Sequence, residues 1–182
     1  MAGGASQQAD TIPKIVDARK LVQREQVLSG TVPASALDRL LAAVESVDGD
    51  VRAELTFGRD LNRHMAVEGK VSCNVQLLCQ RCLQPMPESV EAGVHWGIVW
   101  SEEQGKSLPK DLDPVIQDGD ELNLYQVLED EILLNLPMVA YHDEECVARD
   151  KFQFADKSEE QGEQRENPFK VLEQLKGSSD KS

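Results

Sequence analysis

A pair of cysteines separated by two residues is the feature of this sequence that best suits chemistry. Cys79 and Cys82 lie in a short connection between two predicted strands. Two thiolates at this spacing can chelate one metal ion, because the loop backbone can turn both sulfur atoms toward it. A histidine and a cysteine that follow a predicted helix could supply the other two ligands. The candidate ligands of one structural zinc ion are therefore Cys79, Cys82, His142 and Cys146.

The remaining cysteine, Cys73, does not suit this site. It stands six residues before Cys79 in a predicted strand, which separates the two by about 20 Å, so we expect it to be a small buried residue. The alternative to zinc is that the other thiols only shape the turn. A redox role fits less well, because redox motifs of this spacing are followed by a helix N-terminus, and here Pro85 and Pro87 follow.

The sequence contains no arrangement of residues suited to acid–base or nucleophilic catalysis. Glu129, Asp130 and Glu131 are consecutive on a predicted helix, so their carboxylates should fan out over a solvated face rather than form a catalytic pair. His64 and His95 have no serine and aspartate arrangement that would indicate a triad, and the glycines form no phosphate-binding loop. We therefore predict that the protein is not an enzyme and has no small-molecule substrate.

The charge of the chain restricts its partners. The 182 residues carry a formal net charge of −14, which opposes attraction to nucleic acid or to anionic membranes. A partner attracted to this chain should be basic, such as a ribosomal protein; the alternative is that acidity only keeps the protein soluble. Because the sequence has no signal-peptide pattern and no apolar run of about 18 residues, we expect a cytoplasmic protein without membrane association.

Three segments alternate between apolar and polar residues, which is typical of half-buried strands. They are residues 51–57, 67–77 and 90–100. The connections at 58–63 and 79–87 are short, so these strands are expected to be antiparallel neighbours. Their apolar residues share one face, and that face needs a cover.

Apolar residues at helical spacing predict this cover. A short helix is expected after Asp17, a second at 34–45, and a third at 124–136 that lies over the sheet. Asn123 is the expected N-cap of the third helix, and Pro137 should end it.

Other segments look irregular or short. Residues 31–35 resemble a turn and helix cap, residues 101–113 a polar loop, and residues 114–117 could form a fourth strand. The predicted fold class is α+β: an antiparallel β-sheet of three to five strands covered by helices, with a flexible acidic linker and a short C-terminal helix.

The chain is predicted to contain one domain flanked by polar segments. We expect a disordered N-terminus at 1–11, a single α+β domain at 12–147, an acidic linker at 148–166, a short amphipathic helix at 167–176 and a disordered tail at 177–182. The linker is too rich in carboxylates and too poor in apolar residues to pack.

The predicted C-terminal helix carries an apolar stripe. Asn167 is a suitable cap with proline at the next position, and Phe169, Leu172 and Leu175 share one face. A helix this short is marginal alone, so we expect these three residues to bind a partner. The alternative is that the helix folds back onto its own sheet.

Three islands of this sequence resemble the YceD family of bacterial ribosome-biogenesis proteins. They are the Leu-Cys-Gln-Arg-Cys-Leu run at 78–83, residues 128–139 with His142 and Cys146 after them, and residues 167–176. Their order and spacing also match, and the resemblance covers most of the chain from about residue 12 onward.

The resemblance implies a role in the synthesis, processing or stability of 23S ribosomal RNA of the large subunit, and it supplies no catalytic residues. With the acidic charge, it indicates a non-enzymatic factor that binds a basic ribosomal or assembly protein, or a large-subunit precursor, and associates with rRNA indirectly. One alternative is a direct rRNA-binding module that uses Arg59, Arg63 and Arg81. The least favoured alternative is a zinc- or redox-dependent enzyme.

Overall fold

The computed structural model describes residues 10–117 and 119–148. The chain divides after Cys146 into two units, and every element described here lies in the first. No helix in this described part of the chain is long and apolar enough to cross a membrane.

In chain order the elements are β1 (Ile15–Val16), α1 (Ala18–Gln23), β2 (Val27–Val32), η1 (Ala34–Ala36), α2 (Asp38–Ala43), β3 (Ser46–Arg59), β4 (Met65–Leu78), β5 (Pro85–Val99), α3 (Glu102–Lys106), β6 (Asp113–Ile116), β7 (Leu122–Asn123) and α4 (Leu124–Asn135).

The main sheet has five strands in the order β2-β3-β4-β5-β6. Strands β3, β4 and β5 form a long antiparallel meander, with Arg59 opposite Met65 near one turn and Leu78 opposite Pro85 near the other. β2 pairs antiparallel with β3. The α+β class and the three neighbouring strands predicted from the alternation of apolar residues are therefore confirmed.

The β6 edge of the sheet differs from the antiparallel prediction. β6 runs parallel to β5, with Trp96 opposite Asp113. Parallel neighbours need a crossover connection, and the segment between the two strands supplies it. This segment contains α3, although its polar sequence predicted only a loop. A separate two-stranded sheet pairs β1 with β7, with Ile15 opposite Asn123.

Three predictions for the N-terminal part need correction. The helix expected at 34–45 is divided into η1 and α2, because Leu37 between them has a non-helical backbone (φ −116°, ψ 73°). Thr31, expected in a turn, lies in β2, where the ladder with β3 supplies its backbone partners. The tail expected to be disordered up to residue 11 pairs with the sheet at its end, since the carbonyl of Asp10 accepts a hydrogen bond from the N–H of Thr31 at 3.0 Å.

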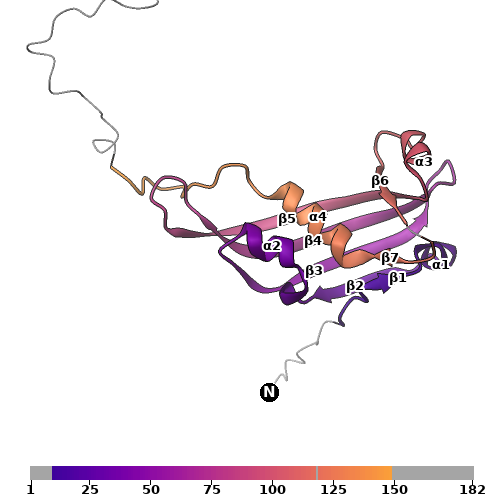
Figure 1. Cartoon of the computed structure of the whole chain (residues 1–182), viewed down its shortest axis with the longest axis horizontal. Helices are drawn as coiled ribbons and strands as arrows, with labels where there is room; N and C mark the ends of the chain where they lie inside the picture. Colours follow the sequence, from indigo (N-terminus) through magenta and orange to yellow (C-terminus); the bar gives the residue numbers. More distant parts are fainter. Residues whose placement is uncertain (1–9, 118, 149–182) are drawn as a thin grey trace, which may run out of the picture. The chain divides into compact units, whose positions relative to one another are not determined.

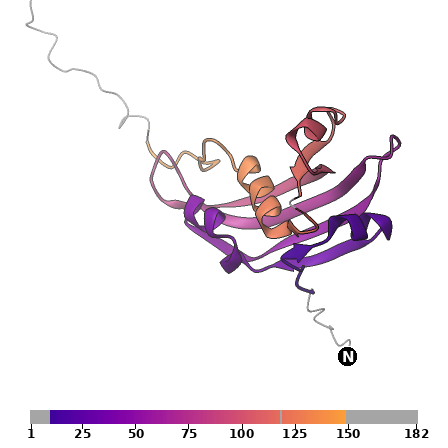
Figure 2. The same cartoon turned by 45° about the vertical axis from the view of Figure 1, so that its right-hand side comes forward.

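The core lies between one face of the main sheet and the helices. α4 and α2 lie over this face (Figures 1 and 2), and α4 packs on β4 and β5. Leu124, Leu128 and Ile132 of α4 are fully buried, as are Phe57 and Trp96 of the sheet. α4 begins at its predicted N-cap and supplies the cover that the apolar sheet face requires.

The three consecutive carboxylates of α4 do not form the solvated face expected from the sequence. Glu129 is only 6% exposed, and its carboxylate accepts hydrogen bonds from the backbone N–H groups of Arg39 and Leu40 in the first turn of α2. Glu131 accepts a hydrogen bond from the indole N–H of Trp96 at 2.6 Å. Glu129 therefore connects α4 to α2, and Glu131 connects α4 to β5. The sequence pattern of the helix does not reveal these donors, which come from other elements.

Candidate metal centre

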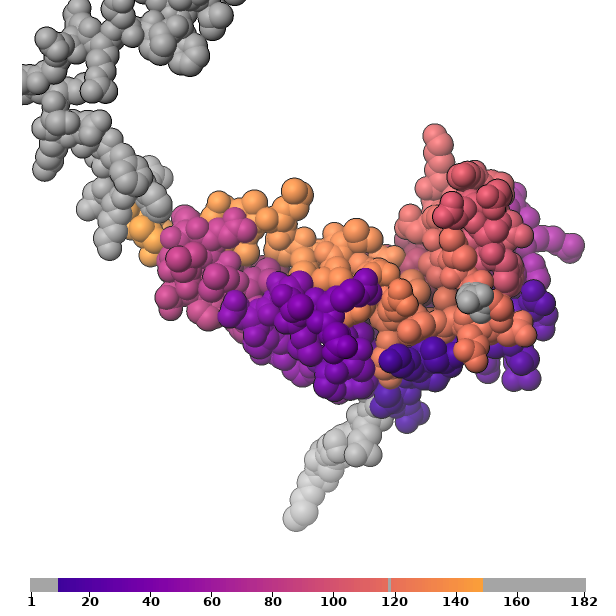
Figure 3. Space-filling model, in the orientation of Figure 1, coloured from indigo at the N-terminus to yellow at the C-terminus, as the bar shows by residue number. Residues whose placement is uncertain are grey.

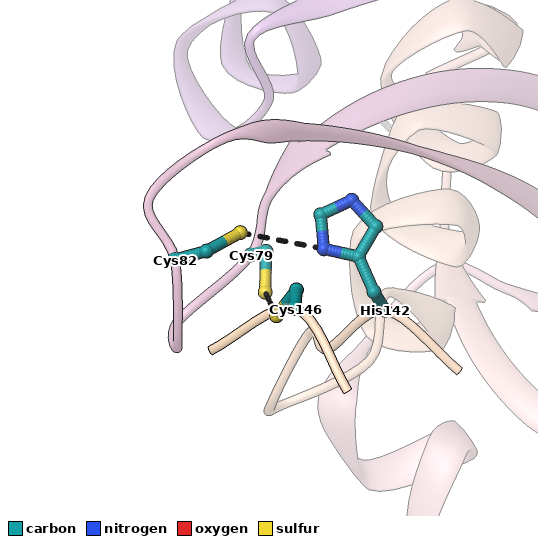
Figure 4. Close-up of side chains that lie close together, drawn as sticks. All are labelled: Cys79, Cys82, His142 and Cys146. Carbon is teal, nitrogen blue, oxygen red and sulfur yellow. Dashed lines mark hydrogen bonds between the residues drawn. The ribbon is translucent and has the colours of Figure 1, made fainter. Parts of the chain in front are cut away.

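The four predicted zinc ligands come from two segments that are far apart in the sequence. One segment is the turn between β4 and β5, and the other follows α4; Figure 3 shows them in contact at one end of the molecule. We call these segments, residues 79–84 and 140–146, the clasp. In Figure 4 the four side chains point toward one another, and their ligand atoms all lie within 4.8 Å of one another. The ligands brought together are Cys79, Cys82, His142 and Cys146.

The distances between ligand atoms suit a tetrahedral zinc ion. Sγ of Cys79 lies 3.7 Å from Sγ of Cys146, and Sγ of Cys82 lies 3.4 Å from Nδ1 of His142. From usual zinc bond lengths, two sulfurs on one tetrahedral ion are about 3.8 Å apart, and a sulfur and a nitrogen about 3.5 Å apart. A disulfide requires about 2 Å between its sulfurs, and the cysteines of the chain are free thiols.

One backbone hydrogen bond and two contacts of the Arg81 side chain hold the two segments of the clasp together around the ligands. The N–H of Gln80 donates a hydrogen bond to the carbonyl of Ala140 at 2.9 Å. The Arg81 guanidinium donates to the carbonyl of His142 at 2.6 Å, and it lies 5.1 Å from the centroid of the Tyr141 ring. The ligand side chains are therefore presented by two segments that also contact each other directly.

The clasp favours a thiolate at Cys79. Burial alone would raise the pKa of this thiol, but the backbone N–H groups of Cys82, His142 and Arg81 lower that pKa to about 5. Burial, together with the neighbouring sulfurs of Cys82 and Cys79, raises the pKa of Cys146 to about 11. One sulfur of the cluster therefore ionises readily and another retains its proton, unless a divalent cation supplies the positive charge that stabilises both thiolates.

This arrangement suits a structural site rather than a catalytic one. Four protein ligands fill the coordination sphere of a tetrahedral ion, whereas a catalytic zinc site keeps one position for water or substrate. Cys79 is fully buried, and the other three ligands are half-buried. Cys73 lies in β4 away from the cluster; it is 5% exposed, as expected, and burial raises the pKa of its thiol.

The arginines considered for RNA binding do not share one surface. Arg59 and Arg63 lie at the turn between β3 and β4, whereas Arg81 belongs to the clasp at the opposite end of β4. The 14 residues of β4 place these ends roughly 45 Å apart. Sequence reasoning missed the structural role of Arg81, although its place between two candidate ligands was the available signal.

The predicted partner-binding residues lie outside the described residues. They are Phe169, Leu172 and Leu175 of the expected helix at 167–176. The acidic linker predicted at 148–166 lies outside them too, apart from its first residue.

The chain is thus an α+β protein whose five-stranded sheet carries a cluster of three cysteines and one histidine at one end. The family model of the large ribosomal RNA subunit accumulation protein YceD matches residues 67–176, a span that includes all four candidate ligands. A Haemophilus influenzae protein named large ribosomal RNA subunit accumulation protein YceD is 32% identical over 167 residues, which is 91% of this chain and 96% of the relative. No solved structure matches the chain significantly. The chain belongs to the YceD family, as its three sequence islands indicated.

Proposed function

We propose that this chain supports the accumulation of large-subunit ribosomal RNA as a non-enzymatic factor that binds a basic ribosomal or assembly protein. The observation that carries the role is the match, along almost the full length of both chains, to a relative named for that accumulation. Ribosome assembly would place this work in the cytoplasm. The choice of a protein partner is supported by charge.

The excess of acidic residues favours a basic protein over direct contact with RNA. The net charge is −14, and on the uncovered sheet face Glu54, Glu68 and Glu91 outnumber Arg52 and Lys70. The same face of β2–β5, strands that are described in full, carries no Phe, Tyr or Trp on which unpaired bases could stack. Association with rRNA would then be indirect, through the partner.

Pull-down of the tagged full chain separates a protein partner from RNA. At moderate salt, a basic large-subunit protein should remain bound after RNase treatment, and the chain should sediment with large-subunit precursors. Loss of all bound material on RNase treatment would assign the binding to RNA. Failure to sediment with precursors or mature large subunits would refute the ribosomal role itself.

We propose in addition that Phe169, Leu172 and Leu175 bind the partner. The support is sequence alone: their spacing is that of one helix face, and they come after Asn167, Pro168 and a run of acidic residues. Truncation after Glu166 should leave the melting temperature nearly unchanged and weaken association with precursors. A large fall in melting temperature would instead assign the segment to the core of the domain.

We also propose that the clasp binds one structural zinc ion. The support is a donor set of three sulfurs and one imidazole nitrogen, with spacings of 3.7 and 3.4 Å within it. When bound, zinc would crosslink the β4–β5 turn to the segment after α4 and so add to the stability of the fold.

Metal analysis of the purified chain tests the zinc proposal with a control inside the same protein. The chain should contain about one equivalent of zinc, and a strong chelator should lower its melting temperature. Cys82→Ser should lose the ion, whereas Cys73→Ala, a change at the cysteine outside the cluster, should retain it. Metal-free protein of unchanged stability would leave the thiols as parts of a turn.

A further inference from the structure

The clasp end of the molecule exposes several large apolar side chains. Met138 is 96% exposed, Leu134 79% and Leu83 65%, and Val139 and Tyr141 are each almost half exposed. We call these five residues the clasp patch. They are five of the eleven large apolar side chains that are exposed in the described part of the chain. Four of them lie within eight residues of the sequence, at positions 134–141. Exposed apolar side chains that share a surface are typical of a protein-binding site.

A groove at the clasp adds negative charge to this end of the molecule, and its lining residues Gln84 and His142 directly follow Leu83 and Tyr141 of the clasp patch. Its volume is about 590 Å³, and its lining includes Met86 and Pro87 together with the exposed acidic residues Asp143 and Glu144. Three of the four clasp ligands, Cys82, His142 and Cys146, also line it. A zinc ion held by three thiolates and one neutral imidazole would carry one net negative charge. The surface therefore combines apolar contacts with a negative potential.

We propose that the clasp patch and the adjoining groove dock a basic amphipathic segment of a large-subunit ribosomal protein, an inference that rests on the proposed function. Lysine or arginine side chains of such a segment would face Asp143 and Glu144, while its apolar side chains cover Met138 and Leu134. Because Gln80 and Arg81 already fix the turn to the segment after α4, little of this surface has to become ordered on binding.

Charge also argues against two other occupants. A second copy of the chain would bring another net charge of −14 to the same acidic surface, and RNA would bring its phosphates, so both would be repelled. The clasp patch therefore fits a cationic partner better than either.

Binding of a defined peptide tests the chemistry of this surface. The probe is a synthetic amphipathic helix of about 18 residues made only of leucine and lysine, with a scrambled peptide of the same composition as reference. The double variant Leu134→Ser, Met138→Ser should bind the helix about tenfold more weakly than the unaltered full chain. The control Leu61→Ser removes a fully exposed leucine from the β3–β4 turn and should bind as the unaltered chain does. Equal binding by both variants, or equal binding of the scrambled peptide, would overturn the inference.

Photo-crosslinking in cells identifies the natural occupant. A photoreactive amino acid at position 138 should crosslink to a basic large-subunit ribosomal protein, and the same group at position 61 should not. Crosslinks from position 138 to RNA, to a second copy or to residues 149–182 of the same chain would refute the docking inference. If the full chain still sediments with precursors in that case, the proposed function stands and only this surface is wrongly assigned; if it does not sediment, the proposed function fails as well.

Discussion

The buried carboxylate of Glu129 provides a quantitative test of how α4 and α2 are joined. Its Oε1 atom accepts the backbone N–H of Arg39 at 2.8 Å and that of Leu40 at 3.0 Å, and Oε2 accepts Nε of Arg39 at 2.8 Å. α2 lacks a side-chain cap of its own, because its N-cap position is Leu37. The Glu129 carboxylate therefore supplies the capping acceptor that Leu37 lacks, for a helix that lies 90 residues earlier in the chain.

Glu129→Ala should lower the free energy of unfolding by about 2–4 kcal/mol. The N–H of Leu40 is buried, and a buried donor left without a partner costs about 1–3 kcal/mol. Loss of the cap at the more accessible N–H of Arg39 adds about 1 kcal/mol. Glu129→Gln keeps an acceptor oxygen of the same shape and should lose only about 1 kcal/mol.

Asp130→Ala is the matched control, one residue along the same helix. Asp130 pairs with the same Arg39 side chain, but both side chains are about half exposed, 47% and 49%. An exposed pair of this kind contributes about 0–1 kcal/mol. Urea unfolding measures all three variants and can be followed by tryptophan fluorescence, because one of the two tryptophans, Trp96, is fully buried. If Glu129→Ala and Asp130→Ala differ by less than about 1 kcal/mol, the capping argument is wrong.

Two further predictions concern the sheet and its β3–β4 turn. A Cβ at Gly69 would lie 2.0 Å from the backbone oxygen of Glu54. Gly69→Ala should therefore lower the free energy of unfolding, measured in urea, by at least about 2 kcal/mol. The control Gly58→Ala places no atom within 4 Å of the added carbon and should change this free energy by less than about 0.5 kcal/mol. The hydrogen bond from His64 lowers the pKa of the Asp60 carboxyl below the ordinary aspartate pKa of 3.8. The ionised carboxyl therefore stabilises the turn above pH 3.8, and this stabilisation is lost as the pH falls through the lowered pKa. Near pH 6, the amides of this turn should therefore be better protected against hydrogen exchange in the unaltered chain than in the Asp60→Asn variant, and the difference should shrink below about pH 4. A difference in protection that does not depend on pH would contradict this.

Elements whose residue pattern reflects burial on one side could be predicted from the amino-acid sequence alone. The alternation along 51–57, 67–77 and 90–100 predicted the meander, because successive residues of a strand face opposite sides of a sheet. Helical spacing predicted α4, and its cap Asn123 was identifiable because an asparagine side chain can bond the first turn locally. The cysteine and histidine donors were likewise visible from residue type and spacing.

Features that depend on contacts between distant segments could not be predicted in this way. Residues 31 and 32, whose types predicted a turn, lie in β2 because they pair with β3. The crossover through α3 brings β6 alongside β5 in the parallel direction. Glu129 looked like a surface carboxylate, yet α2 brings it two backbone donors. The sequence proposed His142 as a partner of Cys82, but their 3.4 Å separation follows from the packing of α4 across the sheet. Local patterns record which side of an element is buried, whereas only the folded chain fixes what that side meets.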